Sequence, residues 1–141
     1  MTGSLFSHKV LIDVKDKTTA VRRDLVQLVP IAGKGRGVVA RRRIPKGTLL
    51  EAAPVIRLEE HDTLTTDTVL SQYPFIWDEP PYVQAFALGW VGLFNHADTP
   101  NCRVETDTGD QVIRIWTKVD VKRGTELTHD YGVEPWFTVA D

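Results

Sequence analysis

Turn-forming residues interrupt this chain so often that only short segments of regular structure fit between them. Ten glycines and eight prolines divide the 141 residues, and the apolar runs between them are short. The segments 9–14 (KVLIDV), 25–31 (LVQLVPI) and 48–58 (TLLEAAPVIRL) have the composition of strands. Strands that follow one another at intervals of about ten residues predict a mostly β fold. Pro30 cannot donate to a strand ladder, so we expect segment 25–31 to lie at an edge or a bulge.

The clearest strand is 111–119 (QVIRIWTKV), in which apolar and polar residues alternate. The odd-numbered positions from Ile113 to Val119 fall on one face, which we expect to be buried. Asp-Thr-Gly-Asp at 107–110 predicts a hairpin turn before this strand, with Gly109 at positive φ. The segments 60–72 and 82–88 predict two short helices, which form a small helical insert at about 58–92.

The composition is that of a single globular domain over residues 1–141, with a core at about 25–132 and a short tail at 133–141. No apolar run approaches the roughly 20 residues that span a membrane. The net charge of −2 gives no reason to expect direct nucleic-acid binding. The single cysteine, Cys102, excludes disulfides within the chain and favours a reducing, cytoplasmic location.

Two polar motifs precede the end of the chain. The glycines of 33–37 (GKGRG) let backbone groups approach a ligand closely, and the other interpretation is a tight turn. This segment matches neither the phosphate-binding loop nor the dinucleotide fingerprint. The pair Asn95-His96, ahead of a Pro-Asn turn, offers amide and imidazole contacts to a polar ligand or to nearby backbone.

The stretch 126–132 (ELTHDYG) places a hydroxyl, an imidazole, a carboxylate and a phenol side by side. A hydrolase triad of Thr128, His129 and Asp130 is disfavoured, because neighbouring strand residues point to opposite faces. The same alternation disfavours a metal site, and the other histidines show no ligand spacing. The remaining interpretation is a strand end that displays Tyr131, whose phenol either orients a nucleophile or is buried with a satisfied hydroxyl.

The order of these motifs resembles that of the SET-domain family of S-adenosylmethionine-dependent protein lysine methyltransferases. The segments GKGRG, ARRRIPKG, LFNHADTPNC and RGTELTHDYG follow one another over nearly the whole chain. The resemblance implies a β-clip-like fold of several short curved sheets, with the late segments tucked into a C-terminal pseudoknot. It implies no metal and two catalytic residues, Tyr131 and His129. The implied cofactor-binding residues are Lys34, Gly35, Arg36, Gly37, Asn95, His96, Tyr131 and Trp136.

The sequence departs from the family pattern in ways that bear on the site. Asp98 stands where many members have a zinc-binding cysteine, and no cysteine follows Tyr131, so the family's zinc cluster cannot form. Ala52 and Pro54 replace a frequent Tyr-x-Gly, for which Tyr73 or Tyr82 in the insert is a candidate substitute. His129 occupies a position that is usually Phe or Tyr, so we expect it to alter the degree of methylation. The aromatic tail residues Trp136 and Phe137 either stack on the cofactor or seal the core.

The resemblance implies an enzyme that methylates lysine on a histone or another basic protein. The alternative is a catalytically silent module that binds a protein tail or the cofactor without turnover, which the missing tyrosine at Ala52 favours. A weaker third reading is a carbohydrate or small-ligand binding domain. The short chain resembles compact, stand-alone bacterial members, and we expect a monomer or homodimer in the cytoplasm, with export into a host nucleus if it is an effector.

Overall fold

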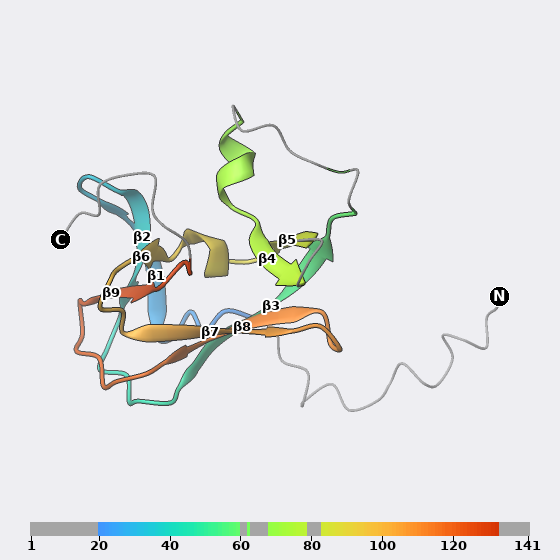
Figure 1. The fold of residues 1–141 in the computed structure, drawn as a ribbon. Helices are drawn as coiled ribbons and strands as arrows, with labels where there is room; N and C mark the ends of the chain where they lie inside the picture. The colour runs from blue at the N-terminus through green and yellow to red at the C-terminus, as the bar shows by residue number, and fades with distance from the viewer. Residues whose placement is uncertain (1–19, 60–61, 63–67, 79–82, 133–141) are drawn as a thin grey trace, which may run out of the picture.

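The computed structural model describes residues 20–59, 62, 68–78 and 83–132, which form strands and two short 3-10 helices (Figure 1). The strands are β1 (Val26–Ile31), β2 (Gly35–Ala40), β3 (Leu49–Arg57), β4 (Phe75–Asp78), β5 (Val83–Ala87), β6 (Asn95–His96), β7 (Cys102–Asp107), β8 (Val112–Thr117) and β9 (Glu126–His129). The helices are η3 (Val69–Gln72) and η4 (Val91–Leu93). The prediction of a mostly β fold of short strands is confirmed, while segment 9–14 lies outside the described residues. No helix in the described part of the chain has the length and apolarity that crossing a membrane requires.

The first sheet has four strands in the order β1-β2-β9-β6. Strand β1, which contains Pro30, lies at its edge as predicted, and the glycine loop joins it to the antiparallel β2. Strand β9, the last described strand, lies inside this sheet, antiparallel to β2 and parallel to β6. A late segment is therefore held between two strands that come much earlier in the chain, as the implied pseudoknot requires.

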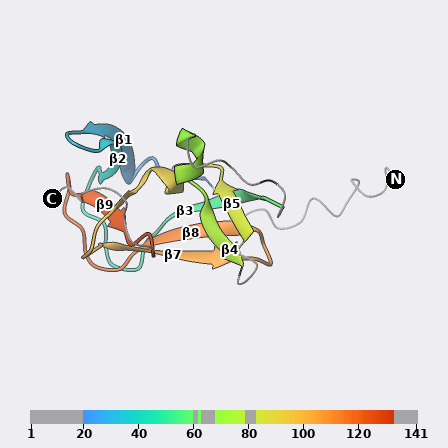
Figure 2. The ribbon, with the colours of Figure 1, turned by 45° about the horizontal axis from the view of Figure 1, so that its top comes forward.

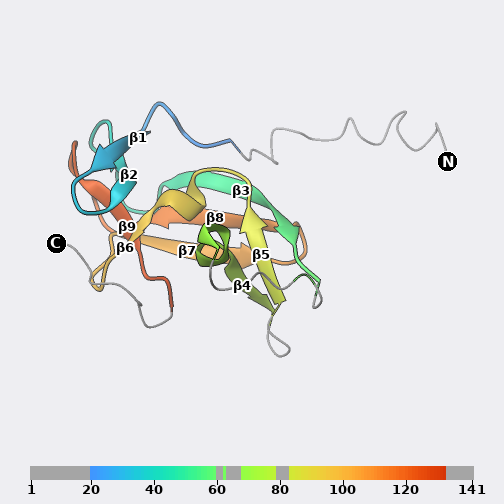
Figure 3. The same ribbon diagram turned by 90° about the horizontal axis from the view of Figure 1, so that it is seen from above.

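The second sheet has five strands in the order β4-β5-β3-β8-β7. Strand β3 pairs with β8 through its first half and with β5 through its second half. On β8, Ile113, Ile115 and Thr117 are buried as the alternation predicts, whereas Val119 lies past the end of the strand and is exposed. Figures 1, 2 and 3 all place β1, β2, β6 and β9 on one side of the molecule and β4 and β5 on the other.

In the turn between β7 and β8, the residue with a positive φ is not the one that the sequence predicts. The residue in that conformation is Gln111, with φ of 56°, and not Gly109. The ladder ends at the pair Asp107 and Val112, which leaves a loop of residues 108–111. Loops of this length are built around a type I turn, in which the strain of positive φ falls after the central residues. The Asp107 carboxylate also accepts a hydrogen bond from the backbone N–H of Asp110, at 2.9 Å.

The predicted helix at 82–88 is wrong, because residues 83–87 form strand β5. Val83 and Ala85 are buried while Gln84 between them is half-buried, so the segment has the period of a strand. Its backbone pairs with β3 on one side and β4 on the other, and this outweighs the local helix propensity. Of the helix predicted at 60–72, the described part forms only η3, and the described insert also contains strands β4 and β5.

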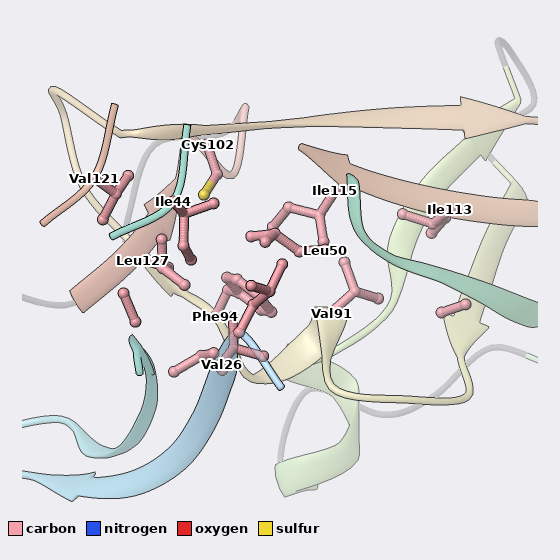
Figure 4. Packing of buried hydrophobic residues seen from close by; sticks show 14 of the residues in the cluster. Val26, Ile44, Leu50, Val91, Phe94, Cys102, Ile113, Ile115, Val121 and Leu127 are labelled. Carbon is pink, nitrogen blue, oxygen red and sulfur yellow. The ribbon is translucent and has the colours of Figure 1, made fainter. Parts of the chain in front are cut away.

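One apolar core lies between the two sheets (Figure 4). Its fully buried members include Val26, Val38, Ile44, Leu50, Val91, Phe94, Ile113, Ile115 and Leu127. Burial raises the pKa of the Cys102 thiol to about 12, so this cysteine is a small apolar side chain, as expected, rather than a nucleophile. Phe94 lies in the core immediately before β6, which connects the Asn95-His96 motif to the apolar core.

Candidate functional site

The phenol of Tyr131 is fixed by residues around β6. Strands β6 and β9 run parallel, with Asn95 opposite Thr128 and His96 opposite His129. The Tyr131 hydroxyl donates to the backbone carbonyl of Phe94 at 3.0 Å. The Tyr131 backbone N–H donates to Nδ1 of His96, also at 3.0 Å. The tyrosine is therefore held at both its backbone and its hydroxyl, beyond the end of β9.

Both ring nitrogens of His96 form hydrogen bonds that hold the residues around Tyr131 in place. Because Nδ1 accepts the Tyr131 N–H, the ring proton lies on Nε2, which donates to the Asp98 carboxylate at 3.0 Å. The ring is 5% exposed, and its centroid is 5.1 Å from that of Tyr131 in an edge contact. Asp98, which stands where many family members have a zinc-binding cysteine, is thus the partner of a positioning histidine.

Tyr131 keeps its proton and is partly exposed. The residue is 37% exposed, so Tyr131 lies at the surface of the site rather than inside the core. Burial of the phenol raises the pKa of Tyr131, and the charge that Tyr73 would carry raises it further. The hydroxyl donates to the Phe94 carbonyl, and a phenol oxygen is an acceptor as well as a donor.

His129 lies beside Tyr131 as a neutral ring. It is 3% exposed, and its centroid is 4.9 Å from that of Tyr131. Phe75 of β4 stacks on its other side, with centroids 6.1 Å apart and an angle of 21° between the planes. Burial lowers the pKa of His129 to about 4, so the ring is uncharged at neutral pH. Together the three rings form an uncharged aromatic wall.

The glycine loop meets the Asn95 motif at a small polar cluster. The Asn95 amide donates to the backbone carbonyl of Arg36 at 2.9 Å and to Glu126 Oε2 at 2.7 Å. Lys34 Nζ lies 2.8 Å from Glu126 Oε1, and both side chains are mostly buried. A Cβ on Gly37 would lie 2.7 Å from Asn95 Nδ2 and 2.7 Å from Glu126 Oε2. Only glycine lets the loop approach this closely.

Asn101 holds β9 in place from the Pro-Asn turn. Its amide donates to the carbonyl of Glu126 at 2.8 Å, and its oxygen accepts the backbone N–H of Thr128 at 2.9 Å. A single side chain thereby pairs with an acceptor and a donor on the same strand. The second half of the motif therefore fixes β9, the strand that carries Glu126 and leads to Tyr131 beyond its end.

The structure brings together most of the sites that the sequence indicates. Residues 34–37, Asn95, His96, His129 and Tyr131 lie around the junction of β2, β6 and β9, whereas Trp136, Phe137 and Tyr82 lie outside the described residues. Sequence reasoning missed the linking roles of Phe75, Phe94, Asn101 and Glu126. The Pro-Asn dipeptide is a signal that could have found Asn101. In the described part of the chain, no group of three or more His, Cys, Asp or Glu side chains is placed to hold a metal ion.

Comparison with known sequences identifies one family and several relatives. The SET domain matches residues 35–132. The H3 lysine-37-specific histone-lysine N-methyltransferase of Schizosaccharomyces pombe is 37% identical over 106 residues, which are 74% of this chain and 71% of that protein. An H3 lysine-36-specific histone-lysine N-methyltransferase of Cryptococcus neoformans is 30% identical over 118 residues, which are 77% of this chain and only 14% of that protein.

Solved structures have the same fold. A crystal structure from Plasmodium falciparum covers 80% of this chain and 97% of its own, with a TM-score of 0.63 and 21% identity. KRYPTONITE in complex with mCHH DNA, an H3(1–15) peptide and SAH covers 77% of this chain and 23% of its own, with a TM-score of 0.61 and 20% identity. Likeness at these identities concerns the fold, and it confirms the predicted arrangement of short curved sheets.

Proposed function

The chain belongs to the SET-domain family, and we propose that the two clusters described above carry out its protein-lysine N-methyltransferase activity with S-adenosylmethionine as methyl donor. The observation that carries this proposal is the Tyr131 hydroxyl, fixed by the Phe94 carbonyl one residue before Asn95. Asn95 in turn contacts the glycine loop and Glu126. Adjacent residues, Phe94 and Asn95, therefore connect the cluster proposed to bind S-adenosylmethionine with the tyrosine proposed to orient the lysine amine.

The polar cluster fits the amino-acid end of S-adenosylmethionine, which carries both a carboxylate and an ammonium group. Lys34 offers a cation for the carboxylate, and Glu126 offers an anion for the ammonium. The backbone of Lys34, Gly35, Arg36 and Gly37 lines the approach, and Asn95 adds amide contacts. Both ring nitrogens of His96 are engaged, so we propose that it contacts the adenine through its backbone. We propose that Trp136 closes this pocket.

The aromatic wall fits the other reactant, a lysine side chain that must lose its proton before it can attack. A free lysine has a pKa of about 10.4, and an apolar, uncharged surrounding lowers that pKa. The rings of Phe75, His129 and Tyr131 provide such a surrounding. S-adenosylmethionine, when bound, supplies a methyl group on a positively charged sulfur.

Tyr131 is proposed to orient the amine rather than to remove its proton. Its hydroxyl already donates to the Phe94 carbonyl, so its oxygen can accept one N–H of the amine. That hydrogen bond would turn the nitrogen lone pair toward the methyl group, while the proton is lost to water before transfer. Alignment of this kind contributes roughly 7–11 kcal/mol in well-oriented model reactions. Tyr73, the partly exposed C-cap residue of η3 in the insert, is the proposed substitute for the family tyrosine that Ala52 replaces.

The test compares the native chain with the Tyr131→Phe variant, using methyl-labelled S-adenosylmethionine and a mixture of histones and cell lysate. We expect transfer by the native chain and a loss on the order of 100-fold in the variant. Donor affinity, measured by calorimetry, should change little because the polar cluster is intact. Donor binding without any transfer by the native chain would favour the silent module. Absence of donor binding would contradict both proposals.

Position 129 is proposed to set the number of methyl groups that the channel admits. His129 is smaller than the Phe or Tyr usual in the family and is packed between Phe75 and Tyr131. The His129→Phe variant should therefore shift the ratio of mono- to higher methylation in mass spectra of the product. An unchanged ratio at equal turnover would contradict this role.

We propose a histone-like or other basic protein as the substrate. The support is the named activity of the relatives on histone H3. The net charge of −2 suits a basic partner and disfavours direct binding of nucleic acid. A monomer or homodimer in the cytoplasm remains our proposal for its assembly and location.

A further inference from the structure

Glu51 is a buried carboxylate outside the site described above. It lies on β3 and is 3% exposed. The backbone N–H of Trp90 donates to both of its oxygens, at 3.1 and 3.0 Å. The backbone N–H of Val91 also acts on this carboxylate and lowers the pKa of Glu51. A Cβ on Gly89 would overlap Glu51 Oε2, so this turn is shaped to receive the carboxylate.

The turn that Glu51 holds leads directly to the reactive end of the site. Trp90 is the N-cap residue of η4, and Phe94 is the C-cap residue at its other end. Val91 and Phe94 are both fully buried, and the Leu93 N–H donates to the Trp90 carbonyl at 2.7 Å. The segment 90–94 is thus a short, packed link. At its start is the Glu51 carboxylate, and at its end is the carbonyl that accepts the Tyr131 hydroxyl.

We propose that Glu51 is a positioning residue, which sets the Phe94 carbonyl and through it the hydroxyl of Tyr131. The inference rests on the proposed function of Tyr131. Hydrogen bonds to an ionised acceptor are roughly twice as strong as those between neutral groups. An ionised Glu51 therefore restrains the start of η4 more firmly than a neutral side chain of the same shape.

The surroundings of Glu51 make this restraint sensitive to pH. Burial raises the pKa of Glu51 to about 7, and the hydrogen bonds from Trp90 and Val91 oppose that rise. The carboxylate borders a cavity of about 610 Å³, where the charged groups facing it are Arg23 and Asp24. The Arg23 guanidinium lies 5.3 Å from the Trp90 ring centroid, and Asp24 pairs with Arg22. From β8 the residue paired with Glu51 is the apolar Ile115.

The experiment measures kcat and KM from pH 6 to pH 9 for the native chain and for Glu51→Gln. We expect kcat of the variant to be lower roughly fivefold to tenfold at pH 8.5, where native Glu51 is ionised, and nearly equal at pH 6. KM for S-adenosylmethionine should stay within about twofold, since the donor cluster is untouched. Asp24→Asn, which removes an exposed carboxylate from the same cavity, is the matched control and should leave the profile unchanged. A native-to-variant ratio that is constant across pH would overturn the proposal.

A double variant separates this inference from the function on which it rests. In a Tyr131→Phe background, Glu51→Gln should have no further effect on kcat, because the group that Glu51 positions is gone. If Tyr131→Phe alone keeps native activity, the proposed function fails. If Tyr131→Phe is impaired and Glu51→Gln lowers kcat equally in both backgrounds, only the positioning role fails. Should Glu51→Gln not fold by circular dichroism, Gly89→Ala displaces the same carboxylate and must show the same pH-dependent loss.

Discussion

Two sides of the molecule, the junction of β2, β6 and β9 and the region of η3 and β4, differ in their surfaces. The first is a network of hydrogen-bonded polar side chains, and the second exposes apolar side chains. At the junction of β2, β6 and β9, Glu126 accepts hydrogen bonds from Lys34 at 2.8 Å and from Asn95 at 2.7 Å. Around η3 and β4, by contrast, apolar side chains face solvent, with Val69 68% and Ile76 53% exposed. Contiguous exposed apolar surface is typical of a site that meets a partner. From this contrast we expect the polar junction to bind S-adenosylmethionine and the side with η3 and β4 to contact the protein substrate.

Beside the shared core, the two sides also meet at a stack of rings. Phe75 belongs to β4, and it packs on His129 of β9, which in turn contacts Tyr131. The insert therefore contributes one wall of the proposed lysine channel without taking part in the polar cluster. Changes on the insert should alter which substrate is used, and changes in the cluster should alter whether the donor binds at all.

The largest effect is expected from Gly37→Ala, in the polar cluster. The new methyl group would push apart Asn95 and Glu126, whose hydrogen bond is 2.7 Å long. Leaving such buried groups badly paired costs about 1–3 kcal/mol. We expect the affinity for S-adenosylmethionine, measured by calorimetry, to fall at least tenfold. Gly109→Ala, whose Cβ would have only an ordinary 3.4 Å contact, is the control and should bind normally.

A smaller effect is expected on the unfolding free energy when the pH is lowered and His129, which lies where the two sides meet, takes up a proton. The pKa of His129 is about 4 in the folded chain and 6.5 when unfolded, so unfolding takes up a proton between these values. The stability that neutral His129 provides is present above pH 6.5 and is lost as the pH falls toward 4. Between pH 7 and pH 5 the native chain should lose about 2 kcal/mol of unfolding free energy from this residue.

Urea unfolding of the native chain and of His129→Phe at the two pH values checks this expectation. Phenylalanine has no proton to take up, so the variant should lack that part of the loss. Equal losses in the two proteins would mean that the ring is not kept neutral by burial.

The smallest effect is expected from Ile76→Ser, on the exposed apolar side. Ile76 is 53% exposed, so its replacement should change the unfolding free energy by less than about 0.5 kcal/mol. If this side receives the protein substrate, KM for that substrate should rise several-fold while donor affinity stays the same. Val119→Ser, at an exposed position beyond β8, is the matched control. Equal KM values for the two variants would contradict the assignment of this surface.

Local patterns in the sequence predicted those features that depend on one segment. The alternation from Ile113 to Thr117 gave the buried face of β8, and Pro30 indicated the sheet edge. The position of Tyr131 past a strand end followed from the same reasoning. The segment 83–87 shows the limit, because its apolar residues suit a helix or a strand, and only the ladders of β3 and β4 decide between them.

Contacts between distant segments could not be read from local patterns. Lys34 and Glu126 are 92 positions apart, and Glu51 and Trp90 are 39 apart. Each pair forms because the sheets bring the segments together, not because either residue belongs to a recognisable periodic motif. The neutrality of His129 is likewise a result of burial, which depends on the complete fold.

The interior position of β9 has a consequence for how the protein is made. Strand β2 spans Gly35–Ala40, whereas β9, which joins it to β6, spans Glu126–His129. A ribosome must release nearly all of the described chain before this sheet can close. Pairings between segments so far apart in sequence are slow to form, because the intervening chain must first be ordered. A nascent or truncated chain without β9 therefore has a partly formed core and no assembled donor pocket, which confines activity to molecules that have completed folding.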